Sequence, residues 1–373
     1  MNEIRAILTA YQKRPPGVGA ALATVVRVEG SSYRRAGARM LILANGTWVG
    51  GISGGCLEGD ALTRARLVMA EAKPALITYD TTQDDAYQIG VGLGCNGIID
   101  VLITPIDPDN PFAIRLLEIC LARPRQTHVL LTVHTVPTGF TGVSAGDVCR
   151  YTGPDSLAGF GASRVITPLS AQIETYLAQK KSAPLWVDLP GGGSVGIFVE
   201  LLLPAPHVVV LGQQYDVYPL VRLLGELGWQ ATVMANPHKL IRPLLAQGTT
   251  VVAPANFESV AVDEQTAFVL MAHDYATDRA NLARVVQTAA PFIGVLGPRV
   301  RTERMVAELA QTGVFVPLTE RIHAPVGLDI GATSPEEIAL SVVAEIRAVL
   351  AGRNGLPLRL RQAPIHEREP QKN

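Results

Sequence analysis

The second half of the chain alternates short apolar runs with helical stretches. This alternation is typical of a doubly wound parallel sheet, in which a helix links each strand to the next. We therefore expect a Rossmann-like C-terminal domain over residues 207–352, followed by a tail over 353–373. The short, stiff segment Pro204-Ala205-Pro206 marks the domain boundary. The expected strands cover residues 208–211, 230–234, 249–252, 267–271 and 292–296.

Residues 1–203 mix strands and helices in a less regular order and form the expected N-terminal domain. A helix over 3–12 is followed by a buried strand over 19–28, a hairpin over 40–49 and a helix over 57–71. The predicted fold class is α/β: a mixed-sheet N-terminal domain plus a C-terminal Rossmann-like doubly wound parallel sheet.

The charge balance argues against several classes of function. With 32 basic and 33 acidic residues, the 373-residue chain has a net charge of −1, so no basic excess indicates binding to nucleic acid or a membrane surface. No apolar run reaches the roughly 18 residues of a transmembrane helix, and the first residues do not form a secretory signal. Four cysteines do not make a disulfide framework in a chain of this length. We expect a cytoplasmic protein with free thiols.

The segment Gly50–Gly59 places a cysteine at a strand-to-helix junction. It reads Gly-Gly-Ile-Ser-Gly-Gly-Cys-Leu-Glu-Gly, and the spacing after Cys56 is helical, so Cys56 is expected in the first helical turn. Unpaired N–H groups and the helix dipole at such a junction bind anions, phosphates above all, and stabilise a thiolate. We predict a phosphate-binding loop at Gly54 and Gly55 with Cys56 as a reactive thiol. The alternative is a small apolar residue in a tight turn.

A second cysteine, Cys95, is framed by glycines in the segment Gly90-Val91-Gly92-Leu93-Gly94-Cys95-Asn96-Gly97. Two thiols that each lie in a glycine-rich loop favour a functional role over a purely structural one. Cys56 and Cys95 are candidates for contact with a metal or for relay of sulfur, and both roles stay open. Cys120 and Cys149 are interpreted as structural.

Three arginines, Arg34, Arg35 and Arg39, lie in and after the loop that precedes the hairpin. They could clamp a phosphate against the glycine loop, because guanidinium groups bind phosphate oxygens through paired hydrogen bonds. The alternative is an exposed loop with scattered charge. Glu58 could orient a partner of the thiolate, or simply favour the helix N-terminus electrostatically.

The first turn of the C-terminal domain departs from the dinucleotide-binding pattern. That pattern needs three glycines, whereas the turn reads Gly212-Gln213-Gln214-Tyr215-Asp216-Val217. Gln214 places a side chain where a pyrophosphate would approach the backbone, and Asn236 stands where an acidic residue would bind ribose. Binding of NAD or NADP is therefore not expected.

Other loops at the carboxyl ends of the expected strands carry candidate site residues. His273 follows one strand and Arg299 follows another, and open α/β sheets bind ligands at this edge. His273 could bind a ligand, act as an acid or base, or be structural. Arg299 could hold a phosphate, or it could lie exposed to solvent at a helix N-terminus. For Arg301 and Arg304, exposure to solvent is the simpler interpretation.

Six motifs between about Ile4 and about Gly352 are long or unusual. They lie at residues 23–40, 50–59, 92–97, 271–274, 293–299 and 323–331. Together they resemble the motifs of the XdhC/CoxI family, the maturation factors of molybdenum hydroxylases such as xanthine dehydrogenase and carbon monoxide dehydrogenase. In the last motif, His323 and Asp329 belong to a loop that its glycines and proline are expected to fix.

The resemblance implies binding of the molybdenum cofactor, protection of it during sulfuration by a cysteine desulfurase, and delivery to an apo molybdenum hydroxylase. A cofactor-insertion chaperone is expected rather than a catalyst. The cofactor is an anionic phosphate-bearing pterin with dithiolene-held molybdenum, which suits glycines, arginines and thiolates. The expected cofactor-binding residues are Gly54, Gly55, Cys56, Cys95, Arg34, Arg299 and His273.

Two other classes of function stay open. The fold alone suggests an NAD(P)-dependent oxidoreductase, against which the first turn counts. A scaffold without bound cofactor would leave the glycine-framed cysteines unexplained. Cys56 and Cys95 are expected to lie close together, opposite the Arg299 loop in a cleft between the domains; the alternative is two domains with unrelated surfaces. Homo-oligomerisation stays open.

Overall fold

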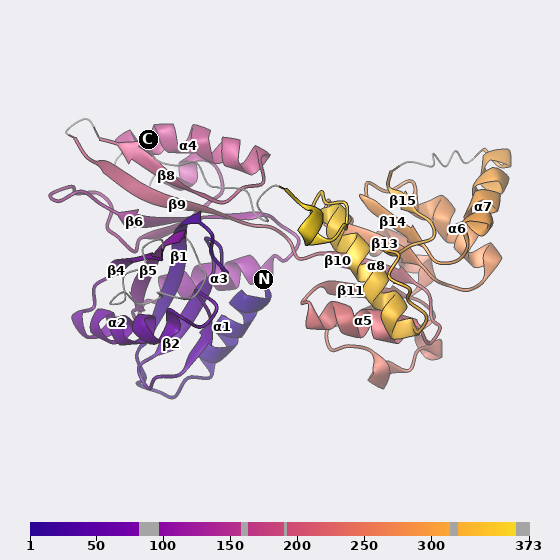
Figure 1. Ribbon diagram of the computed structural model, residues 1–373, viewed down its shortest axis with the longest axis horizontal. Helices are drawn as coiled ribbons and strands as arrows, with labels where there is room; N and C mark the ends of the chain where they lie inside the picture. The colour runs from indigo at the N-terminus through magenta and orange to yellow at the C-terminus, as the bar shows by residue number, and fades with distance from the viewer. Residues whose placement is uncertain (82–96, 158–162, 190–191, 314–319, 363–373) are drawn as a thin grey trace. The chain divides into compact units, whose positions relative to one another are not determined.

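The computed structural model describes residues 1–81, 97–157, 163–189, 192–313 and 320–362. The chain divides into two compact units, the first spanning Met1–Leu203 and the second Pro204–Ala363. Each unit combines helices with strands (Figure 1), so the expected α/β class is confirmed.

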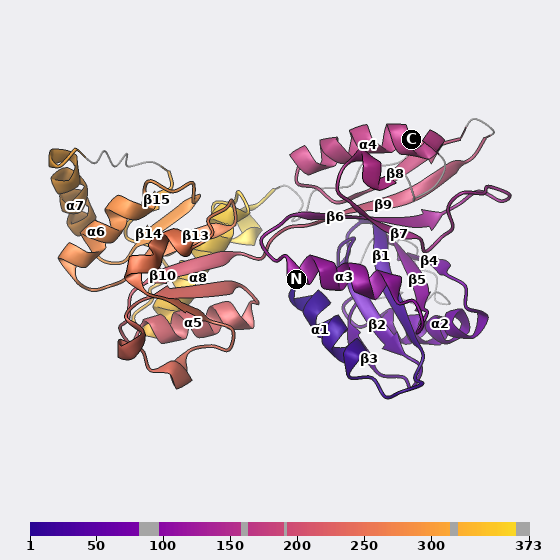
Figure 2. The ribbon, with the colours of Figure 1, turned by 180° about the vertical axis from the view of Figure 1, so that it is seen from behind.

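A five-stranded antiparallel sheet forms the body of the first unit. Its strands and the helices around it are β1 (Ala20–Gly30), β2 (Arg39–Leu43), β3 (Trp48–Gly50), β4 (Ala75–Asp80), β5 (Gly97–Ile106), α1 (Asn2–Gln12), α2 (Glu58–Glu71) and α3 (Phe112–Ala122). The strands pair in the order β3-β2-β1-β5-β4. Side chains alternate along β1, so Ala21 and Ala23 pack with α2 while Ala20 and Leu22 pack with α1 and α3. Helices α1 and α3 lie side by side (Figure 2).

The first unit also contains a four-stranded antiparallel sheet. Its elements are β6 (His128–Thr135), β7 (Val148–Tyr151), β8 (Ala183–Asp188), β9 (Ser194–Leu202), the 3-10 turn η1 (Pro154–Leu157) and α4 (Ser163–Ala178). The strands pair in the order β7-β6-β9-β8. Leu169 and Ile173 of α4 are buried against this sheet, one helical turn apart.

A six-stranded parallel sheet organises the second unit. Its strands are β10 (His207–Leu211), β11 (Gln230–Met234), β12 (Thr250–Val252), β13 (Thr266–Leu270), β14 (Phe292–Val295) and β15 (Ile322–His323). They pair in the order β12-β11-β10-β13-β14-β15, with every pair parallel. This is the Rossmann strand order, which reverses between the first and fourth strands, β10 and β13. The predicted doubly wound sheet is confirmed.

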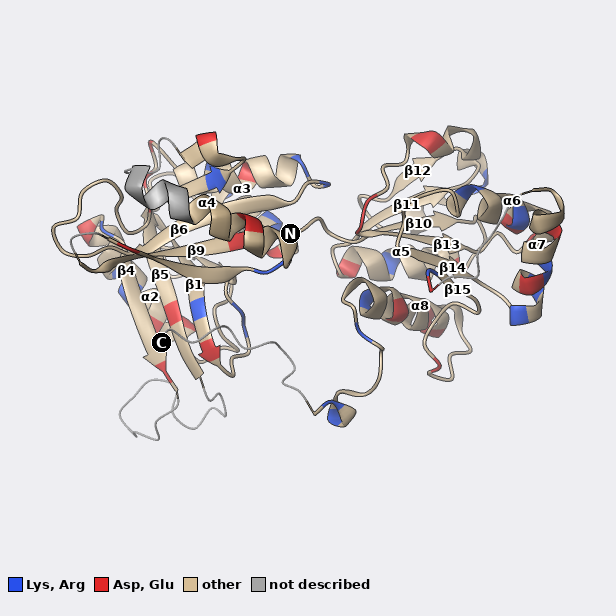
Figure 3. Cartoon of the chain, turned by 90° about the horizontal axis from the view of Figure 1, so that it is seen from above, with Lys and Arg blue, Asp and Glu red and all other residues tan. Residues whose placement is uncertain are grey.

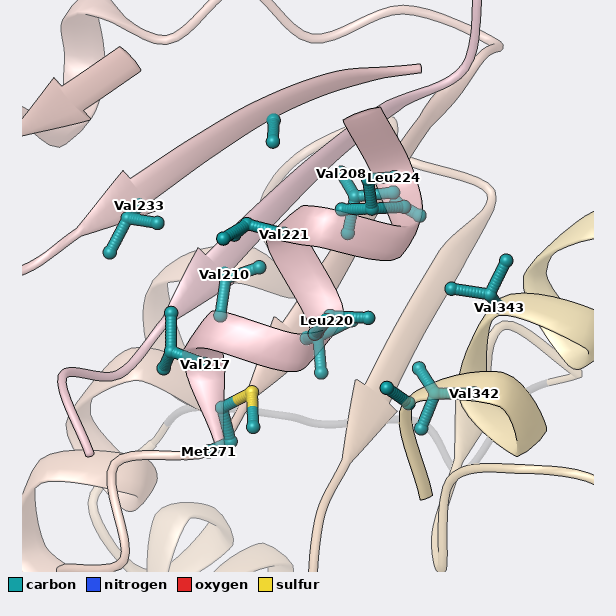
Figure 4. Close-up of a cluster of buried hydrophobic side chains, with 14 of the residues drawn as sticks. Val208, Val210, Val217, Leu220, Val221, Leu224, Val233, Met271, Val342 and Val343 are labelled. Carbon is teal, nitrogen blue, oxygen red and sulfur yellow. The ribbon is translucent and has the colours of Figure 1, made fainter. Parts of the chain in front are cut away.

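Helices cover both faces of this sheet. They are α5 (Val217–Glu226), α6 (Tyr275–Val285), α7 (Arg299–Gln311) and α8 (Pro335–Leu350), with 3-10 turns η2 (Pro237–Lys239), η3 (Arg242–Leu244), η4 (Pro254–Ser259) and η5 (Leu358–Leu360). Val208 and Val210 pack with α5 and α8 (Figure 4), and Val209 and Leu211 pack with α6 and α7. Burying each such side chain contributes about 1.5–3 kcal/mol, which explains the unbroken apolar run in β10.

The start of α8 follows its sequence closely. Ser334 Oγ accepts a hydrogen bond from Glu337 N at 3.2 Å, and the Glu337 carboxylate accepts from Ser334 N at 2.9 Å. Pro335 occupies the first helical position, where its missing N–H costs nothing. These three residues together explain why α8 begins at Pro335.

Charged side chains of both signs are interspersed on both units (Figure 3). This distribution agrees with the net charge of −1. None of the helices in the described ranges is long and apolar enough to cross a bilayer.

Candidate functional site

The glycine loop that follows β3 reaches the surface of the first unit. Gly50 has a φ of +87°, and a Cβ atom there would lie 2.2 Å from the carbonyl oxygen of Arg39, so no residue with a side chain fits. Gly54 and Gly55 are exposed, and a Cβ on Gly55 would meet no atom within 4 Å. The backbone at Gly55 is therefore open to close approach by a ligand, whereas Gly54 lies against Tyr33.

A buried carboxylate, that of Glu58, holds this loop. It accepts hydrogen bonds from the N–H groups of Ile52, Ser53 and Leu57 at 3.1, 2.8 and 3.2 Å, and from the Ser53 hydroxyl. Ser53 Oγ accepts in turn from the N–H groups of Gly55 and Leu57, at 3.1 Å each. Burial alone would raise the pKa of Glu58, but the hydrogen bonds from Ser53 and Ile52 lower it below its ordinary value.

The expected phosphate-binding geometry of this loop needs correction. The junction was expected to offer unpaired N–H groups to a phosphate, but Glu58 and Ser53 bind those of Ile52, Ser53, Gly55 and Leu57. Helix α2 begins at Glu58 with Leu57 as its N-cap, so the cysteine precedes the helix instead of lying in its first turn. A carboxylate of the protein takes the place of the expected phosphate, because the first helical residue can reach back to the loop.

Cys56 is a free, partly exposed thiol next to the open backbone of Gly55. Cys120, in contrast, is fully buried, and burial raises the pKa of its thiol to about 11. Burial also raises the pKa of the half-buried Cys149 thiol. Thiols with raised pKa values are poor nucleophiles near neutral pH, which agrees with a structural role for both.

Cys95 lies outside the described residues, so its proximity to the other loop stays a prediction. The residues on either side of that segment are held together: Thr81 Oγ1 donates to the carbonyl oxygen of Gly97 at 2.7 Å and accepts from its N–H at 3.1 Å. A Cβ on Gly97 would lie 2.5 Å from the carbonyl oxygen of Ser31. Both ends of the segment therefore lie near the start of the arginine-bearing loop.

That loop lines a hollow of about 310 Å³, whose walls include Glu3, Tyr33, Arg34 and Arg35. The Arg34 guanidinium binds the Glu3 carboxylate at 2.5 Å. Tyr33 is 74% exposed, and its ring lies 3.5 Å from where a Cβ on Gly54 would be. Tyr33 thus connects the hollow with the glycine loop, and the phosphate clamp by Arg34 stays a prediction.

Arg39 has a different role, and its expected place in the clamp is wrong. Its guanidinium donates to both carboxylate oxygens of Glu200, with Nη1 at 2.7 Å from Oε1, and to the carbonyl oxygen of Gly37 at 2.9 Å. The two charged side chains are only 5% and 4% exposed. Burial would lower the pKa of Arg39, but the attraction of Glu200 raises it overall. This ion pair ties β2 to β9. Arg39 is not available to bind a ligand, because its loss from the pair would leave the buried Glu200 carboxylate without a partner.

In the second unit the arginines after β14 have separate roles. Arg299 is the first residue of α7 and is exposed. Arg301 forms an ion pair with the buried Asp278 at 2.7 Å and so anchors α7 to α6. Arg304 is largely exposed and pairs with Glu308 at 3.0 Å. The prediction that the side chain is exposed to solvent is therefore confirmed for Arg304 and wrong for Arg301.

His273 pairs with Asp216, a residue to which the sequence alone assigns no role. The His273 Nε2 atom lies 2.6 Å from Asp216 Oδ2, although 57 residues separate them. They follow the neighbouring strands β13 and β10. No sequence signal connects the two residues, because they belong to different motifs and meet only when their strands pair.

The loop that contains His323 and Asp329 is fixed against α8. His323 Nδ1 lies 2.9 Å from Glu345 Oε1, and its ring stacks on Phe292 with ring centroids 4.3 Å apart. The other carboxylate oxygen of Glu345 accepts from Gly327 N at 2.7 Å. Asp329 is exposed. These contacts account for the expected fixed loop.

Two family profiles match this chain. The profile described as the XdhC Rossmann domain matches residues 208–346, and the profile described as the XdhC and CoxI family matches residues 14–80. The chain belongs to the XdhC and CoxI family. The resemblance predicted from the motifs is therefore confirmed.

Known proteins resemble this XdhC and CoxI family member over most of its length. A Bacillus subtilis (strain 168) protein named as a probable xanthine dehydrogenase subunit is 29% identical over 332 residues, which is 88% of this chain and 92% of the relative. The molybdenum cofactor insertion chaperone PaoD from Escherichia coli (strain K12) is 23% identical over 334 residues, 89% and 84% of the two chains. A crystal structure described as a xanthine dehydrogenase from Bacillus halodurans has a TM-score of 0.71 at 26% identity, covering 95% of this chain and 97% of that one.

Proposed function

We propose that this protein is a maturation factor for a molybdenum hydroxylase. In this proposal it binds the molybdenum cofactor, holds it during sulfuration by a cysteine desulfurase, and delivers it to an apo-enzyme of the xanthine dehydrogenase or carbon monoxide dehydrogenase type. Family membership supports the proposal, together with the names of two relatives: a molybdenum cofactor insertion chaperone and a probable component of xanthine dehydrogenase.

The observation that carries the proposal is the surface loop Gly54-Gly55-Cys56 beside Tyr33, a residue that lines the hollow together with Arg34. Gly55 lets a flat ligand approach the backbone, and Tyr33 offers an aromatic face on which a pterin ring can stack. The thiol of Cys56 is a soft ligand suited to molybdenum or to sulfur. The hollow has the volume of a small-molecule site, for which about 300–1,000 Å³ is usual.

The phosphate of the cofactor is assigned to Arg34, not to the N–H groups of the glycine loop, which bind Glu58 and Ser53. Arg34 can exchange partners, because its side chain and that of Glu3 are 33% and 27% exposed. A pair that water reaches contributes only about 0–1 kcal/mol, so a phosphate can replace Glu3 at little cost. Cys56, with Cys95 as the second thiol of the proposal, would hold the metal end of the cofactor.

Anaerobic loading tests this proposal. The purified protein is incubated with molybdenum cofactor, freed of excess ligand, and assayed for molybdenum and pterin. We expect close to one equivalent of each in the wild type, and loss of most retention in Cys56→Ser, a nearly isosteric change. Arg34→Gln should weaken binding roughly ten- to hundredfold, since hydrogen bonds to charged groups contribute about 1.5–3 kcal/mol. His273→Gln and Arg299→Gln test the two site residues predicted in the second unit.

Two matched variants serve as controls. Cys149→Ser removes a half-buried thiol, and Arg304→Gln removes an exposed arginine that, like Arg34, is paired with a glutamate. Both should retain cofactor at the wild-type level. A wild-type protein that holds no cofactor, but binds a cysteine desulfurase and an apo-hydroxylase together, would favour the scaffold function instead.

An NAD(P)-dependent function is disfavoured by the first turn of the second unit. Gln214 is exposed where the backbone would meet a pyrophosphate, and Asp216 adds a carboxylate at the N-terminus of α5. A carboxylate repels a pyrophosphate from the place where this fold normally binds it.

A further inference from the structure

The strand order of the second unit reverses between β10 and β13. In open α/β sheets the crevice at this switch point, outside the carboxyl ends of the strands, is the usual place for chemistry. Asp216 follows β10 and His273 follows β13, and His273 Nε2 lies 2.6 Å from Asp216 Oδ2. The pair therefore occupies the switch point itself.

Asp216 is buried and has one partner among the described residues. Its side chain is 9% exposed, whereas that of His273 is 46% exposed. Its second oxygen, Oδ1, is buried without a hydrogen-bond partner in the part of the chain that the structure describes. The carboxylate also borders a small apolar cavity lined by Leu220, Val269 and Met271. A carboxylate held this way orients an imidazole strongly, because few competing donors or waters reach it.

The bond to Asp216 defines which ring nitrogen of His273 is available to a ligand. A carboxylate accepts, so Nε2 carries the proton that it donates to Asp216. Nδ1 is then the acceptor nitrogen of the neutral ring, on a side chain that solvent reaches. Two groups with these roles, a buried orienting carboxylate and an exposed imidazole, are the parts of a general-base dyad.

The backbone holds His273 in an unfavourable conformation. Its φ is +57°, in the left-handed region that residues other than Gly, Asn and Asp seldom adopt. The preceding N–H, of Ala272, donates to Asp278 at 3.1 Å, and the following residue, Asp274, caps α6 by accepting from Thr277 N at 2.7 Å. Strain that neighbouring contacts maintain is typical of functional sites.

We infer that the His273–Asp216 pair is an acid–base site of the second unit, in which His273 takes a proton from the hydroxyl of water or of a small uncharged ligand. The ligand is uncharged because Asp216 and Asp274 flank the imidazole, and Arg301 of the neighbouring helix α7 is already bound to Asp278. The described residues contain no cluster of three side chains that could hold a metal ion. This role does not depend on cofactor binding by the first unit.

Hydrolysis of 4-nitrophenyl acetate by the full-length protein provides the test. In the expected reaction a water oxygen bonds to the acetyl carbon while its proton moves to His273 Nδ1. The ester C–O bond breaks, 4-nitrophenolate leaves, and the imidazolium then loses its proton to solvent. Acetate and 4-nitrophenolate are the products. The readout is the second-order rate constant from nitrophenolate absorbance.

The informative variant is His273→Asn. Asparagine tolerates a positive φ, so the backbone conformation at this position should be kept while the base is removed, although its shorter amide does not reach Asp216 as Nε2 does. We expect the rate constant to fall at least about tenfold, a conservative share of the roughly 10²–10⁴ that a positioned base supplies. Asp216→Asn should also lower the rate, and it should alter the ¹⁵N signals of the His273 ring by changing which nitrogen is protonated.

His238→Gln is the matched control. His238 is exposed on the loop after β11 in the same unit, and its ring has no carboxylate partner among the residues that the structure describes. The control should keep the wild-type rate. A His273→Asn protein that keeps the wild-type rate would overturn the inference. The same conclusion would follow if His273→Asn and Asp216→Asn changed the unfolding midpoint but not the rate constant. Comparable hydrolysis of the anionic ester 4-nitrophenyl phosphate would contradict the uncharged ligand.

Discussion

Replacing Glu58 with glutamine tests whether one carboxylate shapes the glycine loop. Oε1 accepts from Ile52 N and Ser53 N, and Oε2 accepts from Ser53 Oγ and Leu57 N. Glutamine keeps a single acceptor oxygen, so two of these four bonds are lost whichever way the amide points. Each lost bond to a charged acceptor costs about 1.5–3 kcal/mol, less what the Ser53 hydroxyl recovers by rotating. The local free energy of loop opening should fall by about 2–4 kcal/mol.

Amide hydrogen exchange measures this local free energy directly. A loss of about 2–4 kcal/mol corresponds to roughly 30- to 700-fold faster exchange at Ile52, Ser53 and Leu57, since about 1.4 kcal/mol is a factor of ten. Asp60→Asn is the control: Asp60 lies in the same first turn but binds Arg64 at 2.5 Å instead of the loop. Unchanged exchange in Glu58→Gln would refute the role given to the carboxylate. Equal acceleration in Asp60→Asn would show that the helix dipole, not the loop bonds, is responsible.

Four further outcomes follow from the structure. Because hydrogen bonds lower the pKa of Glu58, its contribution to loop protection in the wild type should be complete above roughly pH 4.5, the ordinary carboxyl value, and be lost as the pH falls through its lower folded-state pKa. Glu200→Gln should lower the free energy of unfolding by about 3–5 kcal/mol in urea titrations, and adding Arg39→Met should restore most of it, because no charge is then buried alone; a loss below 1 kcal/mol would contradict the buried pair. Iodoacetamide should modify Cys56 in the native protein at least about tenfold faster than the buried Cys120, a difference that mass spectrometry of the two peptides checks and that equal rates would disprove. Titration calorimetry should detect no micromolar binding of NAD or NADP, and such binding would favour the oxidoreductase function.

Patterns that a short segment determines by itself could be predicted from the sequence. The apolar run of β10 and the capping box of α8 need only a few neighbouring residues, and the structure contains both. The Rossmann order also follows, because alternating strands and helices connected by right-handed crossovers leave few topologies. The start of α2 was misplaced by a short distance, since the last turn before a helix has no periodicity of its own.

Contacts between residues far apart in the chain could not be predicted. Arg34 and Arg39 look alike in sequence, five residues apart in one loop-and-strand segment, yet one binds a partly exposed glutamate and the other a buried one. The buried partner, Glu200, lies 161 residues away. Which arginine a ligand can reach depends on this partner, and the partner is determined by the packing of two sheets.

The charges at the helix N-termini explain where an anion can bind. Glu58 lies in the first turn of α2, Asp216 is the N-cap residue of α5, and Asp274 caps α6, so each of these ends is already close to a carboxylate of the protein. A phosphate would meet repulsion at these ends, whatever the helix dipole contributes. Helix α7 differs, because it has no acidic residue in its first turn and no side-chain cap, and it begins with the exposed Arg299. An anion bound by the second unit is therefore expected at Arg299, while in the first unit the hollow beside Arg34 takes the role that the glycine loop was expected to have.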